Sequence, residues 1–122
     1  MSETERAQLA AYVDRFNARD FDAVRDMLAD EVRLELVART ELKGRREVER
    51  YFTNYGAVRD WHLVPGFVDE RPAVLVRDPA GPAARPSYFI LLEWVGGQLA
   101  RIRDFRHARY AAESAELLRM DV

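Results

Sequence analysis

The sequence predicts an α+β domain in which three N-terminal helices pack against a curved, mostly antiparallel sheet. Apolar residues recur at helical spacing in the first half of the chain, whereas short β-branched and aromatic runs follow from residue 61 onwards. The pair Gly96-Gly97 between two such runs predicts a tight hairpin, because both central turn positions need a positive φ. A curved sheet wrapped on helices forms a cone, and such a cone suits a small-molecule pocket.

Composition limits the classes of protein that remain. The chain has 122 residues, 48% of them apolar and 33% charged, which is typical of one soluble globular domain over residues 1–122. The absence of cysteine excludes disulfides and thiolate chemistry, and a formal net charge of −2 gives no reason to expect direct nucleic-acid binding. No stretch approaches the ~18 apolar residues of a membrane span, and the N-terminus lacks the order of a signal peptide. We therefore expect a cytoplasmic location and no membrane contact.

Three helices and one strand are predicted in the first half. Apolar residues at three and four spacing predict a helix over Glu3–Asn17, and Asp20 is a suitable N-cap for a shorter helix over Phe21–Ala29. Alternating residues then predict a strand over Val32–Val37. The aromatic stripe of the helix expected over Arg45–Tyr55 is more typical of core packing than of a cofactor site.

The second half is predicted to be mainly β. Two short runs separated by a polar turn predict a hairpin, and a proline-rich stretch then indicates a surface loop. The final residues favour a short helix that packs on the sheet edge or on a partner. In order, the expected segments are strands Trp61–Val68 and Ala73–Arg77, loop Asp78–Pro86, strands Ser87–Trp94 and Leu99–Tyr110, the latter the last and longest strand, and tail Ala111–Val122.

Asp104 is the most suggestive carboxylate, because it falls inside the last of these strands. A strict two-residue turn at the glycine pair would surround it with Phe89, Leu91 and Ile102, whereas a bulge would shift these neighbours. Two interpretations remain open. Asp104 either forms a structural ion pair with Arg103 or Arg106, or lies in an apolar pocket that raises its pKa into the range of general acid/base catalysis.

The order of elements resembles the cone-shaped, cystatin-like fold of nuclear transport factor two-like proteins, which include ketosteroid isomerases and SnoaL-like polyketide cyclases. The segments that carry this resemblance are 12–20, 27–32, Gly44 before the third helix, and 97–105. A closer resemblance is to the SnoaL-like domain at the C-terminus of some extracytoplasmic-function sigma factors, and it rests on segments 60–69, 71–79 and 102–110.

The resemblance also implies roles for particular residues. Tyr12 matches the first-helix tyrosine that donates to an oxyanion in the isomerases, but Leu36 stands where those enzymes have their general base. The second isomerase acid falls among Phe89–Leu91, none of which is acidic, and this argues against ketosteroid isomerisation. Asp104 is similar to the acid/base aspartate of the SnoaL-like cyclases.

Two functions follow as predictions. The first is a regulatory domain, related to the sigma-factor domain, that binds a small apolar molecule and has a possible partner in the transcription machinery. The alternative is a cofactor-independent polyketide cyclase or isomerase with Asp104 as general acid/base and Tyr12 as donor. The pocket is expected to be lined by Phe16, Leu28, Leu36, Phe52, Trp61, Phe89, Leu91 and Ile102.

No cofactor and no metal is expected. His62 and His107 are the two histidines, and neither has an acidic residue at ligand spacing beside it. The resemblance further implies a homodimer that forms through the open face of the sheet.

Overall fold

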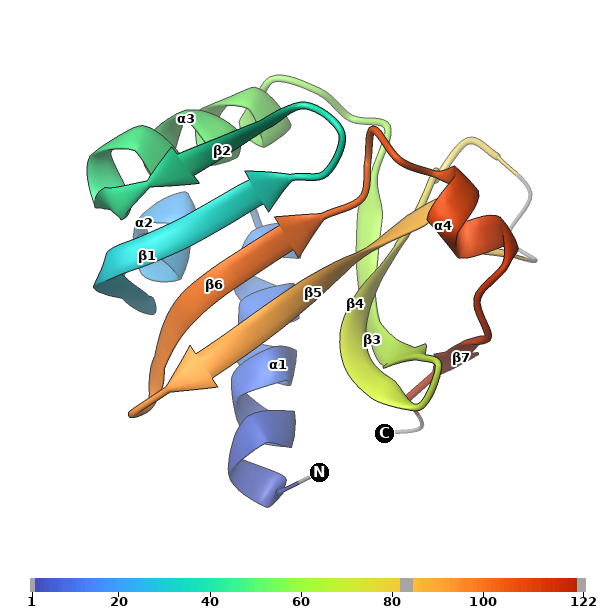
Figure 1. Cartoon of the computed structure of the whole chain (residues 1–122), viewed down its shortest axis with the longest axis horizontal. Coiled ribbons are helices and arrows are strands. Elements are labelled where there is room, and N and C mark those ends of the chain that lie inside the picture. The colour runs from blue at the N-terminus through green and yellow to red at the C-terminus, as the bar shows by residue number, and fades with distance from the viewer. Residues whose placement is uncertain (1, 82–84, 121–122) are drawn as a thin grey trace.

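The chain folds into a curved seven-stranded sheet with helices packed on it, in a computed structural model that describes residues 2–81 and 85–120 (Figure 1). The helices are α1 (Glu3–Asn17), α2 (Phe21–Arg25), α3 (Gly44–Gly56) and α4 (Tyr110–Glu113). The strands are β1 (Leu28–Leu36), β2 (Thr40–Lys43), β3 (His62–Val68), β4 (Arg71–Arg77), β5 (Tyr88–Val95), β6 (Gln98–Asp104) and β7 (Leu117–Arg119). This confirms the predicted α+β cone.

The order of strands across the sheet is β2-β1-β6-β5-β4-β3-β7. Every pairing is antiparallel except that between β1 and β6, which is parallel and joins the N-terminal part of the sheet to its last long strand. Helices α1, α2 and α3 lie on one face of the sheet, behind it in Figure 1. None of the helices in the described residues is long and apolar enough to cross a membrane.

Helix α1 has the predicted bounds and a clear reason to form. The side chain of Ser2 caps its start by accepting a hydrogen bond of 3.1 Å from the Glu5 amide. Its apolar stripe, which includes Tyr12 and Phe16, is buried against the sheet and α3. The helical spacing of the sequence therefore predicted both the helix and its buried face.

The second helix is shorter than predicted, and the first strand begins earlier. Helix α2 ends at Arg25, and Leu28 is the first residue of β1 instead of lying on the helix. Leu28 pairs with Leu99 of β6, and the Leu99 amide donates to the Met27 carbonyl over 2.8 Å. This long-range pairing overrides the helical pattern of a segment that is too short to be a stable helix alone.

Two strands were not predicted. Strand β2 follows β1 through a turn in which Ala38 has a φ of 69° and the Arg39 amide donates to the Leu36 carbonyl over 2.8 Å. Its sequence is polar and largely exposed, so the alternating signal is missing. The tail, expected to be helical, forms only the single turn α4 before β7 pairs with β3. Residues 121–122 of that prediction lie outside the described residues.

Gly66 explains why β7 can approach β3 so closely. A Cβ atom at this position would lie 2.5 Å from the Leu118 carbonyl oxygen and 2.5 Å from Leu75 Cδ1. Because only glycine leaves this space free, the backbone of β7 can pair with β3, and the Met120 amide donates to the Pro65 carbonyl over 3.0 Å.

Both predicted hairpins form. Strands β3 and β4 pair in continuous register around a turn in which Asp69 and Glu70 have positive φ. Strands β5 and β6 meet at Gly96 and Gly97, whose φ values are 59° and 80°. Between them, the described parts of the predicted loop 78–86 contain no strand, and residues 82–84 lie outside the described residues.

Strand β6 ends at Asp104, six residues before the predicted end at Tyr110, and it is neither the last strand nor the longest. A bulge beside Glu93 and Trp94 shifts its register against β5, so that Asp104 lies opposite Ile90. Since a one-residue shift exchanges the two faces of a strand, Phe89 and Leu91 point to the face opposite Asp104. The expected placement of these two residues beside Asp104 is therefore wrong.

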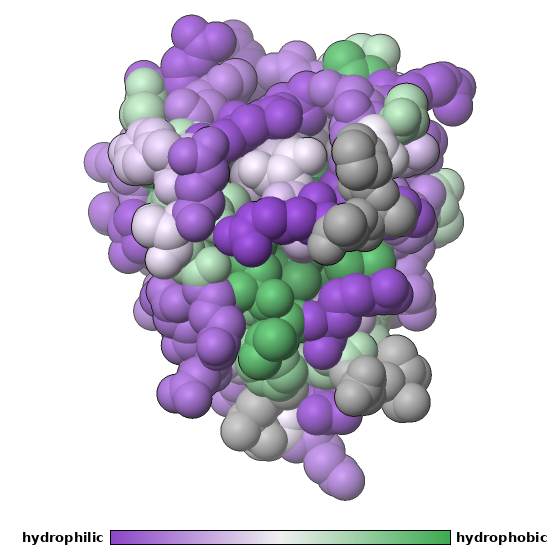
Figure 2. Space-filling model, turned by 90° about the vertical axis from the view of Figure 1, so that its right-hand side faces the viewer, coloured by the Kyte–Doolittle hydropathy of each residue, from purple (hydrophilic) through white to green (hydrophobic). Residues whose placement is uncertain are grey.

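The two faces of the sheet carry separate apolar clusters. The larger one fills the space between the sheet and helices α1 to α3. The second cluster includes Phe89, Leu91 and Ala112, so α4 packs on the opposite face. Figure 2 shows hydrophobic side chains gathered at the centre of the molecular face that lies on the right in Figure 1, with hydrophilic side chains around them.

Candidate functional site

A pocket of about 240 Å³ opens between the β1–β2 hairpin, the C-terminal half of α3 and the segment that follows β6. We call it the α3 pocket. It is lined by Leu36, Leu42, Tyr51, Asn54, Tyr55, Val58, Arg106 and His107. The lining is mainly apolar with a few polar groups, which is the usual character of a small-molecule site.

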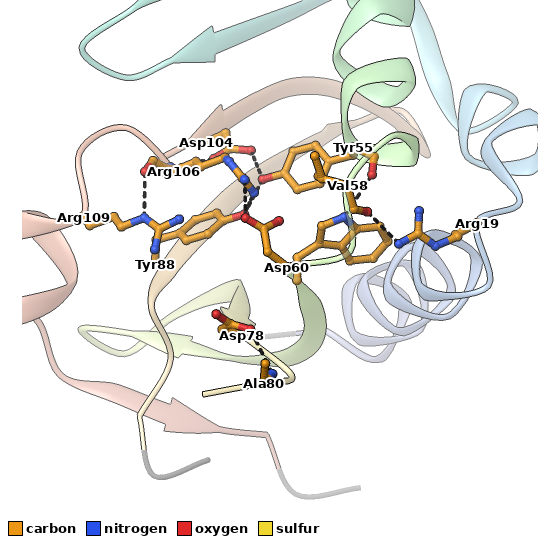
Figure 3. Close-up of polar contacts among 11 residues, drawn as sticks. Arg19, Tyr55, Val58, Asp60, Asp78, Ala80, Tyr88, Asp104, Arg106 and Arg109 are labelled. Atoms are coloured by element: carbon orange, nitrogen blue, oxygen red, sulfur yellow. Dashed lines mark hydrogen bonds and ion pairs between the residues drawn. The ribbon is translucent and has the colours of Figure 1, made fainter. Parts of the chain in front are cut away.

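Asp104 lies directly behind two of the lining tyrosines and is completely buried. Its Oδ2 atom accepts hydrogen bonds of 2.7 Å from the hydroxyls of both Tyr51 and Tyr55. Its Oδ1 atom accepts a hydrogen bond of 2.8 Å from the backbone amide of Arg106. The carboxylate is thus satisfied by three donors, and the bond from Tyr55 is visible in Figure 3.

A chain of hydrogen bonds connects this carboxylate to the surface. The hydroxyls of Tyr55 and Tyr88 are 2.6 Å apart, and Arg106 Nη1 donates to the Tyr88 hydroxyl over 3.1 Å. Because the single proton of Tyr55 is directed at Asp104, Tyr88 must be the donor of the bond between the two tyrosines. Donation therefore runs in one direction, from Arg106 through Tyr88 and Tyr55 to Asp104 (Figure 3).

Burial controls the ionisation of this cluster. It raises the pKa of Asp104 above its ordinary value, although the hydrogen bonds from Tyr51 and Tyr55 act in the opposite direction. Burial and the nearby charge of Asp104 raise the pKa of Tyr51 and Tyr55 well above their usual range, and that of Tyr88 to about 12. The tyrosines are therefore neutral donors at neutral pH, and Asp104 is the group whose proton is most easily exchanged.

The structure excludes the predicted ion pair of Asp104. Arg103 Nε instead donates to Glu35 over 3.0 Å, and Arg106 Nη2 donates to Asp60 over 2.6 Å. Within residues 2–81 and 85–120, no ion pair includes Asp104. The carboxylate is held by neutral donors.

Arg106 is fixed at the edge of the pocket. Burial of its guanidinium disfavours the charge, but the hydrogen bond to Asp60 and the interactions with Tyr88 and Tyr55 together raise the pKa of Arg106 above its ordinary value. The guanidinium also lies over the rings of Tyr55 and Tyr88, 5.4 and 5.9 Å from their centroids. Next to it, burial and the charge of Arg39 lower the pKa of His107, so this imidazole is neutral at pH 7.

Tyr12 lies in the core and does not line the α3 pocket. Its hydroxyl is buried and, among the described residues, has no hydrogen-bond partner. Burial and the charge of Asp104 raise its pKa above the ordinary value. The structure thus keeps Tyr12 neutral and near Asp104, but does not bring it to the pocket wall.

Most of the side chains expected to line the pocket form the core instead. Leu36 is the one that lines the α3 pocket. Phe89 and Leu91 belong to the cluster on the opposite face, because of the bulge in the β5–β6 hairpin. The remaining five fill the large cluster between helices and sheet, and they are Phe16, Leu28, Phe52, Trp61 and Ile102.

Sequence reasoning missed the polar part of the site. Tyr51 and Tyr55 are four residues apart in the aromatic stripe of the third predicted helix, and that stripe was interpreted as core packing. The signal that could have revealed them is that two tyrosines on one helix face bring two hydroxyls into a core, where each needs a partner. Asp104 supplies that partner.

These features define a cone-shaped α+β domain with a small-molecule pocket beside a buried, tyrosine-bound carboxyl group. The chain belongs to the SnoaL-like domain family, whose model matches residues 9–102. This confirms the predicted SnoaL-like and nuclear transport factor two-like relationship. No curated protein matches the chain.

Solved structures show the same fold. Bal32a, from a soil-derived mobile gene cassette, is 19% identical with a TM-score of 0.67, over 91% of this chain and 95% of that one. A protein of Kribbella flavida with the provisional name of a ketosteroid isomerase is 26% identical with a TM-score of 0.62, over 84% of this chain and 77% of that one. SalBIII, an epoxide hydrolase/cyclase-like enzyme of pyran ring formation in the polyether salinomycin, is 18% identical with a TM-score of 0.57. The match covers 84% of this chain and 90% of that one.

Proposed function

We propose that this protein binds a small, predominantly apolar molecule in the α3 pocket. The observation that carries the proposal is the hydrogen-bonded contact of buried Asp104 with Tyr51 and Tyr55, two residues that line this pocket. Leu36, Leu42 and Val58 offer apolar area, and the tyrosines provide a fixed polar floor. A volume of about 240 Å³ suits a compact ligand with a single hydrogen-bonding group.

The alternative to ligand binding is that the protein's own side chains fill the space. They already fill the interior of the cone, which was expected to be hollow. Binding at the α3 pocket can be separated from this case with 2-naphthol as the probe. Trp61 reports on the pocket, because its indole Nε1 donates to the Tyr55 carbonyl over 3.0 Å and its ring lies 5.7 Å from that of Tyr55. A Trp94→Phe background removes the second tryptophan signal.

The test compares two valine substitutions. Val58→Phe fills the pocket, whereas Val95→Phe changes an exposed valine next to the glycine turn. We expect 2-naphthol to quench Trp61 in the background protein and in Val95→Phe, and Val58→Phe to bind at least about tenfold more weakly. Equal binding by all three proteins, or no binding by any, would contradict the proposal.

Acid/base catalysis is the second candidate, and the raised pKa of Asp104 supports it. Since the carboxylate is completely buried, its proton transfer with a ligand would pass through a tyrosine. The Tyr55 oxygen would take a proton from a carbon acid while its own proton moves to Asp104, which leaves an enolate in the pocket. The named isomerase and cyclase-like structures have this fold, so a cyclase or isomerase reaction is compatible with it.

The relationship to the sigma-factor domain, and with it a partner in the transcription machinery, is a further proposal. It is supported by segments 60–69 and 102–110 of the sequence, which contain Asp60, Asp104 and Arg106 of the hydrogen-bonded cluster. The observation that tests it is the coding sequence beside this one, because a fused or adjacent sigma region would support regulation and a polyketide cluster would support catalysis.

The homodimer also remains a proposal. The hydrophobic area in Figure 2 supports it, since an apolar area on a surface is a feature of interfaces. Leu118 of β7 is 52% exposed. Sedimentation at micromolar concentration tests the proposal, and a stable monomer would overturn it.

A further inference from the structure

We propose that the molecule bound in the α3 pocket is an organic acid, with an apolar body on the aliphatic wall and a carboxylate on the guanidinium of Arg106. This inference rests on the proposed binding function and names the chemical class of its ligand. It is carried by the charges and free donors at the edge of the pocket.

Positive charge dominates the pocket's edge. Arg106 lines the pocket, and Arg109 lies beside it, with its Nε donating to the Arg106 carbonyl over 3.0 Å (Figure 3). Arg39 is in the β1–β2 turn, bonded through its amide to the carbonyl of the lining residue Leu36. In the described part of the chain, neither Arg39 nor Arg109 forms an ion pair.

The lowered pKa of His107 agrees with this arrangement. After burial, the charges that lower it come from Arg39, Arg106 and Arg109, while Asp104 acts in the opposite direction. The imidazole of a lining residue therefore lies within the field of three guanidinium groups. Two carboxylates oppose that field: Asp60 is paired with Arg106, and Asp104 is enclosed behind the tyrosines.

Arg106 has donors to spare and is held in place to use them. A guanidinium has five N–H groups, and its hydrogen bonds with described residues use one on Nη1 for Tyr88 and one on Nη2 for Asp60. The side chain is 21% exposed and packs on two tyrosine rings, so little conformational freedom is lost when a ligand binds. A planar carboxylate is an anion that matches such a fork of donors in geometry.

The carboxylate of Asp60 would compete with a ligand carboxylate for the guanidinium of Arg106. Its carboxylate belongs to the exposed segment between α3 and β3, and its side chain is 47% exposed. A ligand carboxylate that contacts Arg106 would share the guanidinium with Asp60 or displace it. Removing the charge of Asp60 should therefore strengthen the binding of an acid and leave the binding of a neutral analogue unchanged.

The experiment compares 2-naphthoate with 2-naphthamide, which have the same apolar body. We expect the native protein to bind 2-naphthoate at least about tenfold more tightly than 2-naphthamide at neutral pH and low salt, and this preference to fall as salt is added. Asp60→Asn should tighten the binding of naphthoate several-fold and leave that of naphthamide unchanged. Arg103→Gln, which removes a guanidinium paired with Glu35, is the matched control and should change neither.

Two further outcomes separate the inference from the function on which it rests. Equal affinity for the acid and the amide would overturn the organic-acid inference while leaving small-molecule binding intact. Absence of binding by both probes would contradict the binding function itself.

If Asp60→Asn does not change the affinity for naphthoate, Arg106 is not the group that receives the carboxylate. Arg106→Gln should abolish the preference for the acid, with the naphthamide affinity showing that the variant is folded.

Discussion

The hydroxyl of Tyr51 donates a hydrogen bond of 2.7 Å to Oδ2 of Asp104, although the two residues are 53 positions apart in the chain. Tyr51 belongs to α3 and Asp104 ends β6, so the bond joins the helical layer to the end of an interior strand of the sheet. A second bond from Tyr55 to the same oxygen makes the connection double. These bonds are buried, which makes the loss of one partner costly.

Removal of either hydroxyl should destabilise the protein. Tyr51→Phe and Tyr55→Phe each leave Asp104 with one donor fewer, and we expect each to lower the free energy of unfolding by about 1–3 kcal/mol. Tyr110→Phe is the matched control, because Tyr110 is 69% exposed, and it should change stability by less than about 0.5 kcal/mol. Urea denaturation measures all three. Tyrosine variants as stable as the control would show that the bonds contribute nothing.

Asp104 should make stability depend on pH in a particular direction. Its folded pKa is raised above the unfolded value of about 3.9, so the folded protein keeps a proton that the unfolded chain has lost. Its contribution is therefore complete below the unfolded pKa and is lost as the pH rises through the folded pKa. We expect the stability of the native protein, relative to that of Asp104→Asn, to fall as the pH rises above about 4 and through the folded pKa of Asp104. Denaturation at a series of pH values measures this difference, and a constant or rising difference would contradict the raised pKa.

Arg19 should be needed to hold the segment after α3. Its Nη1 and Nη2 atoms donate to the carbonyls of Gly56 and Val58 over 3.0 and 2.8 Å, and its guanidinium lies 4.6 Å from the centre of the Trp61 ring. Arg19→Gln should lower stability by about 1–2 kcal/mol, and it should weaken 2-naphthol binding because Val58 lines the pocket. Arg15→Gln, at an exposed position of α1, is the control. Thermal unfolding and titration with 2-naphthol measure both effects. Equal results for Arg19→Gln and Arg15→Gln would contradict this role of Arg19.

Gly66→Ala should separate β7 from β3. The new methyl group would overlap the Leu118 carbonyl, which belongs to the backbone and cannot move without breaking the pairing. We expect a loss of about 1–3 kcal/mol and loss of hydrogen-exchange protection at the Met120 amide. Gly81→Ala is the control, since its Cβ would meet its nearest neighbour at an ordinary 3.5 Å. Unchanged protection of Met120 in Gly66→Ala would contradict the explanation.

The sequence predicted the α+β fold, helix α1 and both hairpins because these depend on local spacing and turn chemistry. Register depends on more than the turn. The two glycines predicted the β5–β6 hairpin correctly, but the bulge beside Trp94 decides which side chains share a face with Asp104. No local signal indicates that bulge, and for this reason Phe89 and Leu91 were placed on the wrong face.

The site was predictable only in part for a similar reason. Asp104 stood out as a carboxylate in an apolar strand, and the structure places it in the core. Its partners come from α3 and not from the adjacent arginines, because Arg103 and Arg106 point their charges at Glu35 and Asp60. Such choices between near and distant partners depend on tertiary packing.

The parallel pairing of β1 with β6 also sets the order in which the molecule can form. The two hairpins need only neighbouring residues, whereas the contact of Glu35 with Arg103 closes a separation of 68 positions. Such closure is slow compared with the formation of a hairpin. On the ribosome, a nascent chain that has emerged only as far as β5 lacks the strand that carries Asp104, so the α3 pocket can be completed only near the end of synthesis.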